Sequence, residues 1–183
     1  MSVQTLTKGW EFKQTDEEQW MPVAQVPTNV HLDLMDNKKW VVCGQRIVAQ
    51  LTGVPRIPDP FLGFNELKCE WVGEKSWTYR TTLPTAPAPK TGRKAVLAFD
   101  GLDTFAHVRL NGQTILKSDN MWIPYRVDIT TTLKEGNENV LEIDFASALL
   151  EARKIKDAHP EHKWVGFNGD MARLAVRKAQ YHW

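Results

Sequence analysis

The sequence predicts an all-β fold, an antiparallel β-sandwich, because alternating segments and tight turns follow one another along the chain. Several segments alternate apolar and polar residues with a period of two, which is typical of strands that bury one face. Asn111-Gly112 stands between two such segments and favours a two-residue hairpin turn, since both residues accept a positive φ. Residues 84–89 are rich in proline, and residues 136–139 give a further turn signal. Strands and turns at this spacing indicate a sandwich between about residues 76 and 146.

Four alternating segments predict individual strands, and one apolar run predicts a fifth. The residues that share one face of the four strands are Trp77, Tyr79, Thr81 and Leu83; Ala106, Val108 and Leu110; Tyr125, Val127 and Ile129; and Leu141, Ile143 and Phe145. Residues 95–99 are almost continuously apolar, which suits a central strand. Ser147 is expected to cap a helix that runs through Lys156 and ends before Pro160. A short helical turn is expected within residues 29–37.

Composition and charge exclude several classes of protein. The chain has 183 residues, enough for one large domain, and its 23 Lys and Arg nearly balance its 22 Asp and Glu, for a net charge of +1. This balance argues against binding to nucleic acid or to an anionic membrane surface. No segment predicts a membrane-spanning helix, and the N-terminus has no apolar signal core. Cys43 and Cys69 form no metal or redox motif, so we expect a reducing, cytoplasmic compartment.

No motif of the sequence carries a catalytic, cofactor or metal site by itself. The patterns Gly-x-Ser-x-Gly and His-Glu-x-x-His are absent, as is a phosphate-binding glycine loop. His159 and His162 stand close together, but Pro160 breaks a helix between them and no third ligand is indicated. Most acidic residues lie beside lysine or in turns, which indicates a solvated surface. From the residues alone we assign no catalytic residue, no metal and no cofactor.

Two groups of short motifs are spread along nearly the whole chain. The more general group is Gly101-Leu102-Asp103-Thr104 and Leu110-Asn111-Gly112. The more particular group is Asp59-Pro60-Phe61 with Asn65-Glu66, Trp71-Val72-Gly73 with Trp77-Thr78-Tyr79, and Arg177-Lys178-Ala179-Gln180-Tyr181-His182-Trp183. The general motifs are shared by many family-two glycoside hydrolases, including β-galactosidases and β-glucuronidases. Combined with the second group, they resemble the N-terminal domain of a family-two β-mannosidase, most closely of the fungal, intracellular type.

This resemblance implies a fold and a role. The implied fold is a galactose-binding-like jelly-roll β-sandwich with a few short helices, over residues 1–183. The implied role is the non-catalytic N-terminal domain of a β-mannosidase, which hydrolyses terminal non-reducing β-D-mannose residues of β-mannosides with retention. In that family both catalytic glutamates lie in a barrel domain, far beyond residue 183. The implied partners are that barrel domain and, in the full enzyme, β-mannosides, and the chain alone is expected to be inactive.

Candidate site residues follow from the resemblance, near the C-terminal end. Residues 167–183 are expected to lead into the remainder of the enzyme, because in the family the following segment reaches the sugar. The residues implied to bind substrate are Arg177, Tyr181, His182 and Trp183. The alternative is that they lock the segment against the barrel. A second group either lies near the mouth of the pocket or holds a loop in place: Asp59, Asn65 and Glu66.

The segment 167–183 also carries large apolar side chains, spread too evenly for one helix face to hide them. They are Phe167, Met171, Leu174, Val176, Tyr181 and Trp183. In a complete enzyme a domain interface buries such residues. Without the barrel, we expect some of them to form an exposed apolar patch.

Residues 40–56 do not fit the family pattern, in which the loop at residues 37–39 runs almost directly into Ile57. The inserted residues are apolar yet lack a clean helix or strand period. One interpretation is a retained intron in the gene, and the other is a genuine surface loop of this homologue. Both stay open, because long loops are tolerated thermodynamically.

The sequence leaves two alternatives to the β-mannosidase hypothesis. The first is another family-two glycosidase, a β-galactosidase or a β-glucuronidase, because these enzymes share the general motifs. The second belongs to a different class, a stand-alone carbohydrate-binding or interaction domain with a rim of exposed aromatic residues. Titration with mannose or mannobiose distinguishes the second alternative, and the fold by itself decides neither.

Deleting residues 40–56 tests whether this segment contributes to folding. We expect the melting temperature to stay unchanged or to rise, because shortening a loop lowers the entropic cost of closing it. Thermal unfolding of the deletion variant beside the full chain measures this. A loss of several kcal/mol would show instead that the apolar residues of the segment belong to the core.

Overall fold

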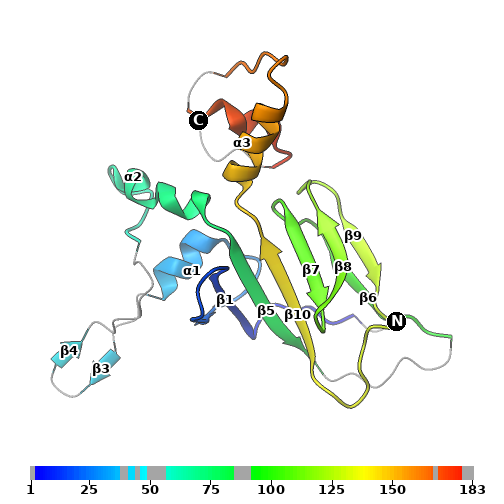
Figure 1. Ribbon diagram of the computed structural model, residues 1–183. Coiled ribbons are helices and arrows are strands. Elements are labelled where there is room, and N and C mark those ends of the chain that lie inside the picture. The colour runs from blue at the N-terminus through cyan, green and yellow to red at the C-terminus, as the bar shows by residue number, and fades with distance from the viewer. Residues whose placement is uncertain are drawn as a thin grey trace.

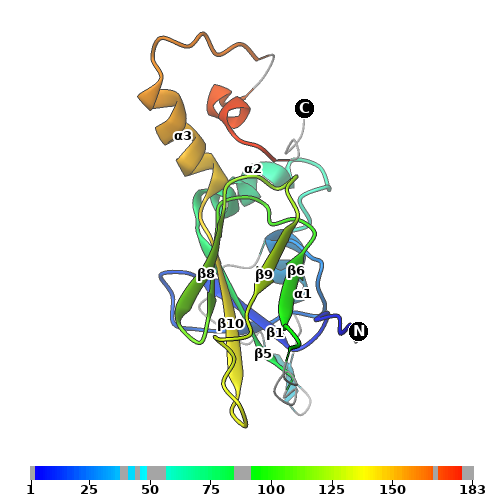
Figure 2. The same cartoon turned by 90° about the vertical axis from the view of Figure 1, so that its right-hand side faces the viewer.

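The computed structural model describes residues 3–37, 41–43, 46–48, 57–84, 92–166 and 169–178 (Figure 1). They form a β-sandwich in which the larger layer is a six-stranded antiparallel sheet with the order β2-β1-β5-β10-β7-β8. Its strands are β1 (Trp10–Gln14), β2 (Met21–Pro22), β5 (Trp77–Leu83), β7 (Ala106–Leu110), β8 (Gln113–Ser118) and β10 (Asn139–Phe145). The smaller layer pairs β6 (Val96–Phe99) with β9 (Tyr125–Asp128). The predicted all-β sandwich is therefore confirmed, and Figure 2 shows the two layers side by side.

The core lies between the layers, on the faces that the alternation predicted. Phe12 is fully buried, and its ring stacks on Tyr79 with centroids 5.5 Å apart and lies 6.0 Å from the ring of Trp77. Leu141 and Ile143, on the neighbouring strand β10, are also buried. Aromatic rings of this size supply most of the apolar area that a sandwich removes from water.

The hairpin at Asn111-Gly112 is confirmed. Asn111 has φ 54° and Gly112 has φ 81°, and they connect β7 to β8 with Leu110 opposite Gln113. The Asn111 side chain also binds outside its own hairpin, because its Nδ2 donates to Asn139 Oδ1 over 2.8 Å. The turn therefore fixes the start of β10 as well as the register of β7 and β8.

Strand β6 departs from the expectation of a central strand. The apolar run does form a strand, but β6 pairs only with β9 among the residues that the structure describes. Val96 is 51% exposed, while Leu97 and Phe99 pack against the core. The prediction was wrong because a short apolar run does not show how many of its faces are covered.

Two helices begin where the sequence predicted them. Helix α1 (Val30–Asp36) follows Asn29, whose Oδ1 accepts a hydrogen bond from Leu32 N over 3.1 Å. Helix α3 (Ala148–Ala158) follows Ser147, whose Oγ accepts from Leu150 N over 3.1 Å, and it ends before Pro160. Each cap satisfies an amide that the first turn of a helix leaves unpaired.

Three further short elements were not predicted from the sequence. Helix α2 (Asn65–Cys69) runs directly into the 3₁₀ helix η1 (Glu70–Glu74), and a second 3₁₀ helix, η2 (Met171–Ala175), lies near the C-terminal end. None of them is long enough to show a helical period. Helices α2 and α3 lie at the same end of the sandwich (Figure 1).

The segment 40–56 contains a two-stranded pair, β3 (Val41–Cys43) with β4 (Arg46–Val48). The sequence showed no clean period in this segment, because three residues a side are too few to show one. The other residues of the segment lie outside the described part of the chain. Whether the segment is an intron or a genuine loop stays a prediction.

A buried carboxyl group links helix α1 to the core. Asp33 is only 2% exposed, and its oxygens accept hydrogen bonds from Tyr79 Oη over 2.6 Å and from Thr28 Oγ1 over 3.0 Å. Burial raises the pKa of Asp33 above its usual value, although the two hydrogen bonds oppose this effect. Burial, followed by the nearby carboxylate of Asp33, also raises the pKa of Tyr79.

Asp33 gives a testable dependence of stability on pH. Because its pKa is raised in the folded state, its contribution is fully present below the unfolded pKa and is lost as the pH rises through the folded value. Relative to the variant Asp33→Asn, the free energy of unfolding of the natural chain is expected to rise as the pH falls from about 7 to about 4. Urea unfolding at several pH values measures the difference. Asp157→Asn, at an exposed position near the end of α3, is the control, and a difference that is constant or falls contradicts the prediction.

Candidate functional site at the C-terminal segment

The C-terminal segment, residues 169–178, folds back on its own domain. Helix η2 packs against α3, and Ala152, Ala172 and Val176 form a small apolar cluster of buried side chains. Phe105 and Ala148 pack against this cluster. The segment is thus held by a hydrophobic contact of its own, separate from the core of the sandwich.

An arginine on α3 ties this segment to η1 by two ion pairs. Arg153 Nε donates to Asp170 Oδ2 over 2.8 Å, and its Nη1 donates to Glu74 Oε1 over 3.0 Å. Asp170 Oδ1 also accepts from Ala172 N over 2.9 Å, which caps the start of η2. The hydrogen bond from Arg153, together with that from the Ala172 amide, lowers the pKa of Asp170. Arg153 therefore joins three elements that are distant in the sequence.

Two loops of the sandwich hold the end of the segment, and we call this arrangement the tail clamp. Arg177 O accepts a hydrogen bond from Met121 N over 3.0 Å, within a parallel bridge between Asn120 and Arg177. Lys178 Nζ lies 3.2 Å from Asp103 Oδ2, and the Lys178 side chain is only 14% exposed. A Cβ atom at Gly101 would lie 2.6 Å from Met121 O, so glycine allows the two loops to meet.

The structure places one of the four predicted substrate-binding residues. The backbone of Arg177 belongs to the tail clamp, while its side chain is exposed. Tyr181, His182 and Trp183 lie outside the described residues, so their roles stay predictions. Sequence reasoning missed the loops that hold this segment. Part of their signal was present, because Asp103 belongs to a motif that carried the family resemblance.

Of the second predicted group, Asp59 and Asn65 hold a loop. Asp59 Oδ1 accepts from Phe61 N over 2.9 Å, and Asn65 Nδ2 donates to Asp59 O over 3.0 Å. Glu66, on α2, is exposed. These contacts favour the role of holding a loop in place over a position near the mouth of the pocket.

The expectation of an exposed apolar patch in residues 167–183 is met only in part. Leu174 is 45% exposed, whereas Val176 is buried against α3. The difference arises because the segment finds a partner in its own domain. Phe167, Tyr181 and Trp183 lie outside the described residues.

The carboxylates that the described residues bring together are held by arginine. Asp144 Oδ2 lies 2.7 Å from Arg109 Nη1, and Glu142 Oε2 lies 3.7 Å from Arg109 Nε. The two carboxylates therefore share one guanidinium group. No group of three or more His, Cys, Asp or Glu side chains arranged for a metal ion, and no helix suited to crossing a membrane, occurs in the described part of the chain.

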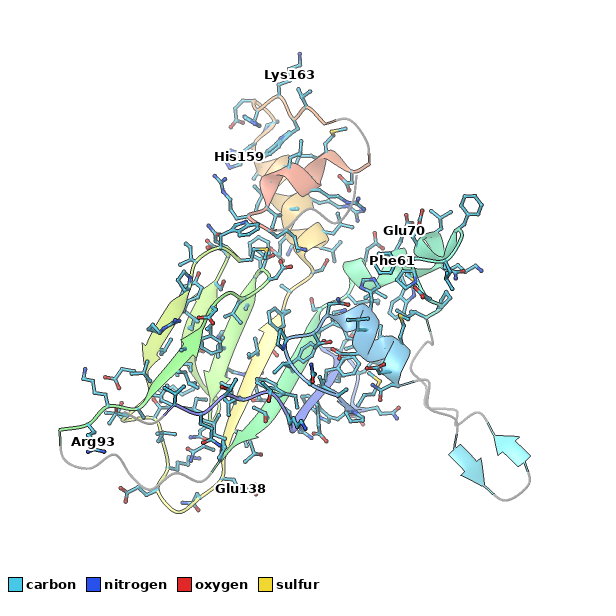
Figure 3. All side chains as sticks on the ribbon, turned by 180° about the vertical axis from the view of Figure 1, so that it is seen from behind. Phe61, Glu70, Arg93, Glu138, His159 and Lys163 are labelled. Atoms are coloured by element: carbon cyan, nitrogen blue, oxygen red, sulfur yellow. The ribbon has the colours of Figure 1, made fainter. Side chains whose placement is uncertain are left out.

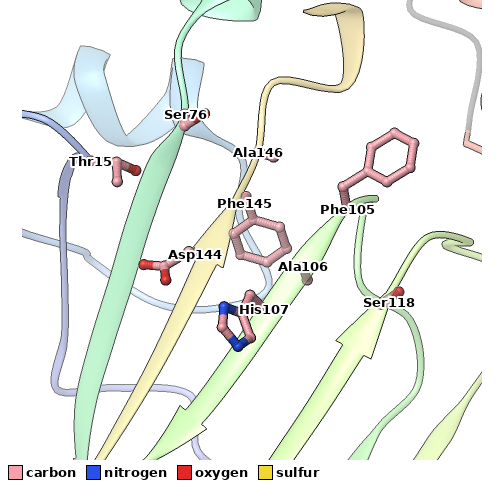
Figure 4. Close-up of a pocket in the computed structure, with 9 residues that line it drawn as sticks. All are labelled: Thr15, Ser76, Phe105, Ala106, His107, Ser118, Asp144, Phe145 and Ala146. Atoms are coloured by element: carbon pink, nitrogen blue, oxygen red, sulfur yellow. The ribbon is translucent and has the colours of Figure 1, made fainter. Parts of the chain in front are cut away.

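A depression of about 340 Å³ opens at the ends of β5, β10 and β7 (Figure 4). It is lined by Thr15, Ser76, Phe105, Ala106, His107, Ser118, Asp144, Phe145 and Ala146. Its acid and its histidine are already engaged, because Asp144 binds Arg109 and Thr78, and His107 Nε2 lies 2.7 Å from Thr114 Oγ1. We therefore place the candidate site at the tail clamp.

Comparison with known proteins shows the family to which this chain belongs. Residues 10–183 match the family described as glycosyl hydrolase 2 galactose-binding domain-like. The chain is 54% identical over 181 residues to β-mannosidase B of Thermothelomyces thermophilus, covering 97% of this chain and 19% of that protein. It is 51% identical over 183 residues to β-mannosidase B of Aspergillus terreus, covering 98% of this chain and 20% of that protein. The chain thus spans about one fifth of the length of the curated relatives it matches.

Solved structures agree with this assignment. The crystal structure of a β-D-mannosidase from Dictyoglomus thermophilum superposes with a TM-score of 0.77 at 33% identity, covering 99% of this chain and 20% of that one. The sandwich with its folded-back segment is therefore a galactose-binding-like domain. The chain belongs to glycosyl hydrolase family 2 and corresponds to the N-terminal domain of a β-mannosidase-like protein.

The variant Lys178→Met tests whether the tail clamp holds the C-terminal segment. It keeps the apolar stem of the side chain but removes the ion pair with Asp103. Hydrogen exchange of the Met121 amide, which donates to Arg177 O, is expected to speed up by as much as about fivefold, the range of a weak, partly exposed ion pair.

Gly101→Ala is expected to have a larger effect on the same amide, because its Cβ would collide with Met121 O. Lys163→Met, at an exposed position, is the matched control. If Met121 exchanges at the same rate in Lys178→Met as in the natural chain, the ion pair does not hold the segment.

Proposed function

We propose that this chain is the non-catalytic N-terminal domain of a β-mannosidase that releases terminal non-reducing β-D-mannose residues from β-mannosides with retention. The observation that carries the proposal is the identity of 51 to 54% with two proteins named β-mannosidase B over almost the whole chain. The similarity to a β-glucuronidase of Dictyoglomus thermophilum is much lower, at 17% identity and a TM-score of 0.52, and supports the fold alone.

The role is non-catalytic because the chemistry needs groups that the described residues do not offer. A retaining glycosidase uses two carboxyl groups about 5–5.5 Å apart, one as a nucleophile and one as an acid and base. The neighbouring carboxylates Glu142 and Asp144 share Arg109, and Glu74 and Asp170 share Arg153. An arginine between two carboxylates engages the oxygen atoms of both in ion pairs. Both catalytic groups would then come from the barrel domain of the full enzyme.

The contribution of this domain would be to present its C-terminal segment to the substrate. The tail clamp fixes the backbone at Arg177, one of the predicted contact residues, and at Lys178, shortly before the other three. Tyr181, His182 and Trp183 would then either touch the sugar or lock the segment against the barrel. In either role, a fixed starting point reduces the conformational entropy that is lost when the segment is placed at the site.

A chimera tests the proposal. The N-terminal fifth of β-mannosidase B of Thermothelomyces thermophilus is replaced by this chain, to which it is 54% identical. We expect the chimera to release 4-nitrophenol from 4-nitrophenyl β-D-mannoside, and not from the β-galactoside or the β-glucuronide. The isolated chain is expected to give only the buffer rate.

A chimera that folds but does not turn over the mannoside would count against the proposed role. Turnover by the isolated chain that survives repurification would show that it carries a catalytic site of its own. Titration of the isolated chain with mannobiose completes the comparison, because tight binding would favour a stand-alone carbohydrate-binding domain.

A further inference from the structure

We propose that an apolar loop formed by Phe61, Leu62, Phe64 and Leu67 is the docking surface of this domain for the remainder of its own polypeptide. The inference rests on the proposed function, because it takes the barrel-containing part of a β-mannosidase as the partner. The loop precedes α2 and extends into it, and Figure 3 shows Phe61 at the outer edge of the domain.

The four side chains of the apolar loop are largely exposed to solvent. Phe61 is 91% exposed and Phe64 81%, while Leu62 and Leu67 are 63% and 61% exposed. Single exposed apolar residues are common on protein surfaces, but four large ones lie here within one short segment. Aromatic residues such as phenylalanine are enriched in the buried centre of interfaces, where charged residues are depleted. This composition points to a protein surface as the occupant.

The backbone of the loop is hydrogen-bonded, although its side chains are exposed. Asp59 Oδ1 accepts from Phe61 N over 2.9 Å, and Asp59 O accepts from Asn65 Nδ2 over 3.0 Å and from Leu62 N over 3.2 Å. Gly63 has φ 59°, which allows the chain to turn between the two phenylalanines. A loop fixed in this way pays little entropy when it binds.

Both ends of the loop are anchored in the core of the sandwich. Ile57 is 1% exposed and Cys69 is 2% exposed, and Cys69 Sγ donates to Pro58 O over 3.6 Å. The chain therefore passes from fully buried residues to almost fully exposed ones and back within a short stretch. Because both ends of the loop are buried and its turn is hydrogen-bonded with the phenylalanines facing outward, we infer that a second surface covers them.

The apolar loop and the tail clamp lie at one end of the domain. Helix α2 continues into η1, which contacts α3, and Arg153 on α3 binds both Glu74 of η1 and Asp170 before η2. Figures 1 and 2 show α2 and the C-terminal segment at the same end of the sandwich. A domain that follows the C-terminal segment in the chain would thus meet the apolar loop.

The size of the patch favours a partner in the same chain over a second copy. Stable interfaces between separate proteins bury about 1,200–2,000 Å² in total, whereas four side chains supply only a few hundred Å². A covalent connection raises the effective concentration of the partner, so a small patch suffices within one polypeptide. The chain spans about one fifth of the length of its relatives, which leaves four fifths of such a protein available as the occupant.

Hydroxyl-radical labelling of Phe61 and Phe64 in the isolated chain and in the chimera tests the inference. We expect both phenylalanines to be labelled several-fold less in the chimera, with Val96 on β6 as the control for general reactivity. Equal labelling of both phenylalanines in the isolated chain and in an active chimera would overturn the docking surface and leave the proposed function intact. An inactive chimera with protected phenylalanines would support the docking surface and count against the proposed function.

A pair of substitutions gives an independent readout. Phe61→Ser with Phe64→Ser is expected to leave the melting temperature of the isolated chain unchanged, because both side chains are exposed there. The same pair is expected to lower the melting temperature of the chimera, where the apolar contact would be lost. Val96→Ser is the matched control, at another exposed apolar position. An equal effect of the pair on the chain and on the chimera would contradict the inference.

Discussion

Ser147 makes the hydrogen bonds on which the functional end of this domain depends. Its Oγ donates to Gly73 O over 2.6 Å and accepts from Leu150 N over 3.1 Å, while its backbone N donates to Ser76 Oγ over 3.2 Å. The residue is 5% exposed, so each of these bonds is shielded from water. One side chain thereby fixes the end of β10, the start of α3 and the end of η1 relative to one another. Everything beyond the sheet at this end is built on that junction.

The direction of α3 determines where the C-terminal segment lies. Because Ser147 sets the first turn of the helix, Arg153 is placed between Glu74 and Asp170, and Ala152 faces Ala172. The ion pairs alone contribute little, since Arg153 is 40% exposed and partly exposed pairs are weak. The buried alanines permit a close approach that larger side chains would prevent. Packing of the alanines therefore positions the C-terminal segment against α3, and the ion pairs of Arg153 fix how the segment is aligned along the helix.

The sequence predicted those parts of the fold that depend on local order. Alternation gave the strands β5, β7, β9 and β10, Asn111-Gly112 gave the hairpin, and Ser147 gave the start of α3. Each of these signals lies within a few residues of the structure that it produces. The prediction of a central strand at residues 95–99 was wrong because the covering of a strand is decided by distant parts of the chain. Helix α2 was missed because five residues are too few to show a period.

The candidate site was harder to predict than the fold, for the same physical reason. The tail clamp joins Asp103 to Lys178 and Met121 to Arg177, and no local pattern connects such distant residues. The resemblance marked Asp103, Arg177 and Lys178 as motif residues without indicating what they contact. Gly101 shows how a motif residue acts through space, because its missing Cβ makes room for the carbonyl of Met121. The glycine of the motif is thus explained by a contact between two loops, and that contact is visible only in the structure.

This end of the domain combines an anchored backbone with exposed apolar side chains. Its backbone is fixed by buried anchors at Ile57, Cys69 and Ser147, yet it presents Phe61 and Phe64 to water. A flexible loop would turn such side chains inward and reduce the cost of exposing them. Because the hydrogen-bonded backbone holds the side chains outward, the isolated domain bears the free-energy cost of exposing them to water. Covering the loop with another surface removes this cost and so favours binding. The constraint that holds the C-terminal segment in place therefore also keeps the apolar loop ready for a partner.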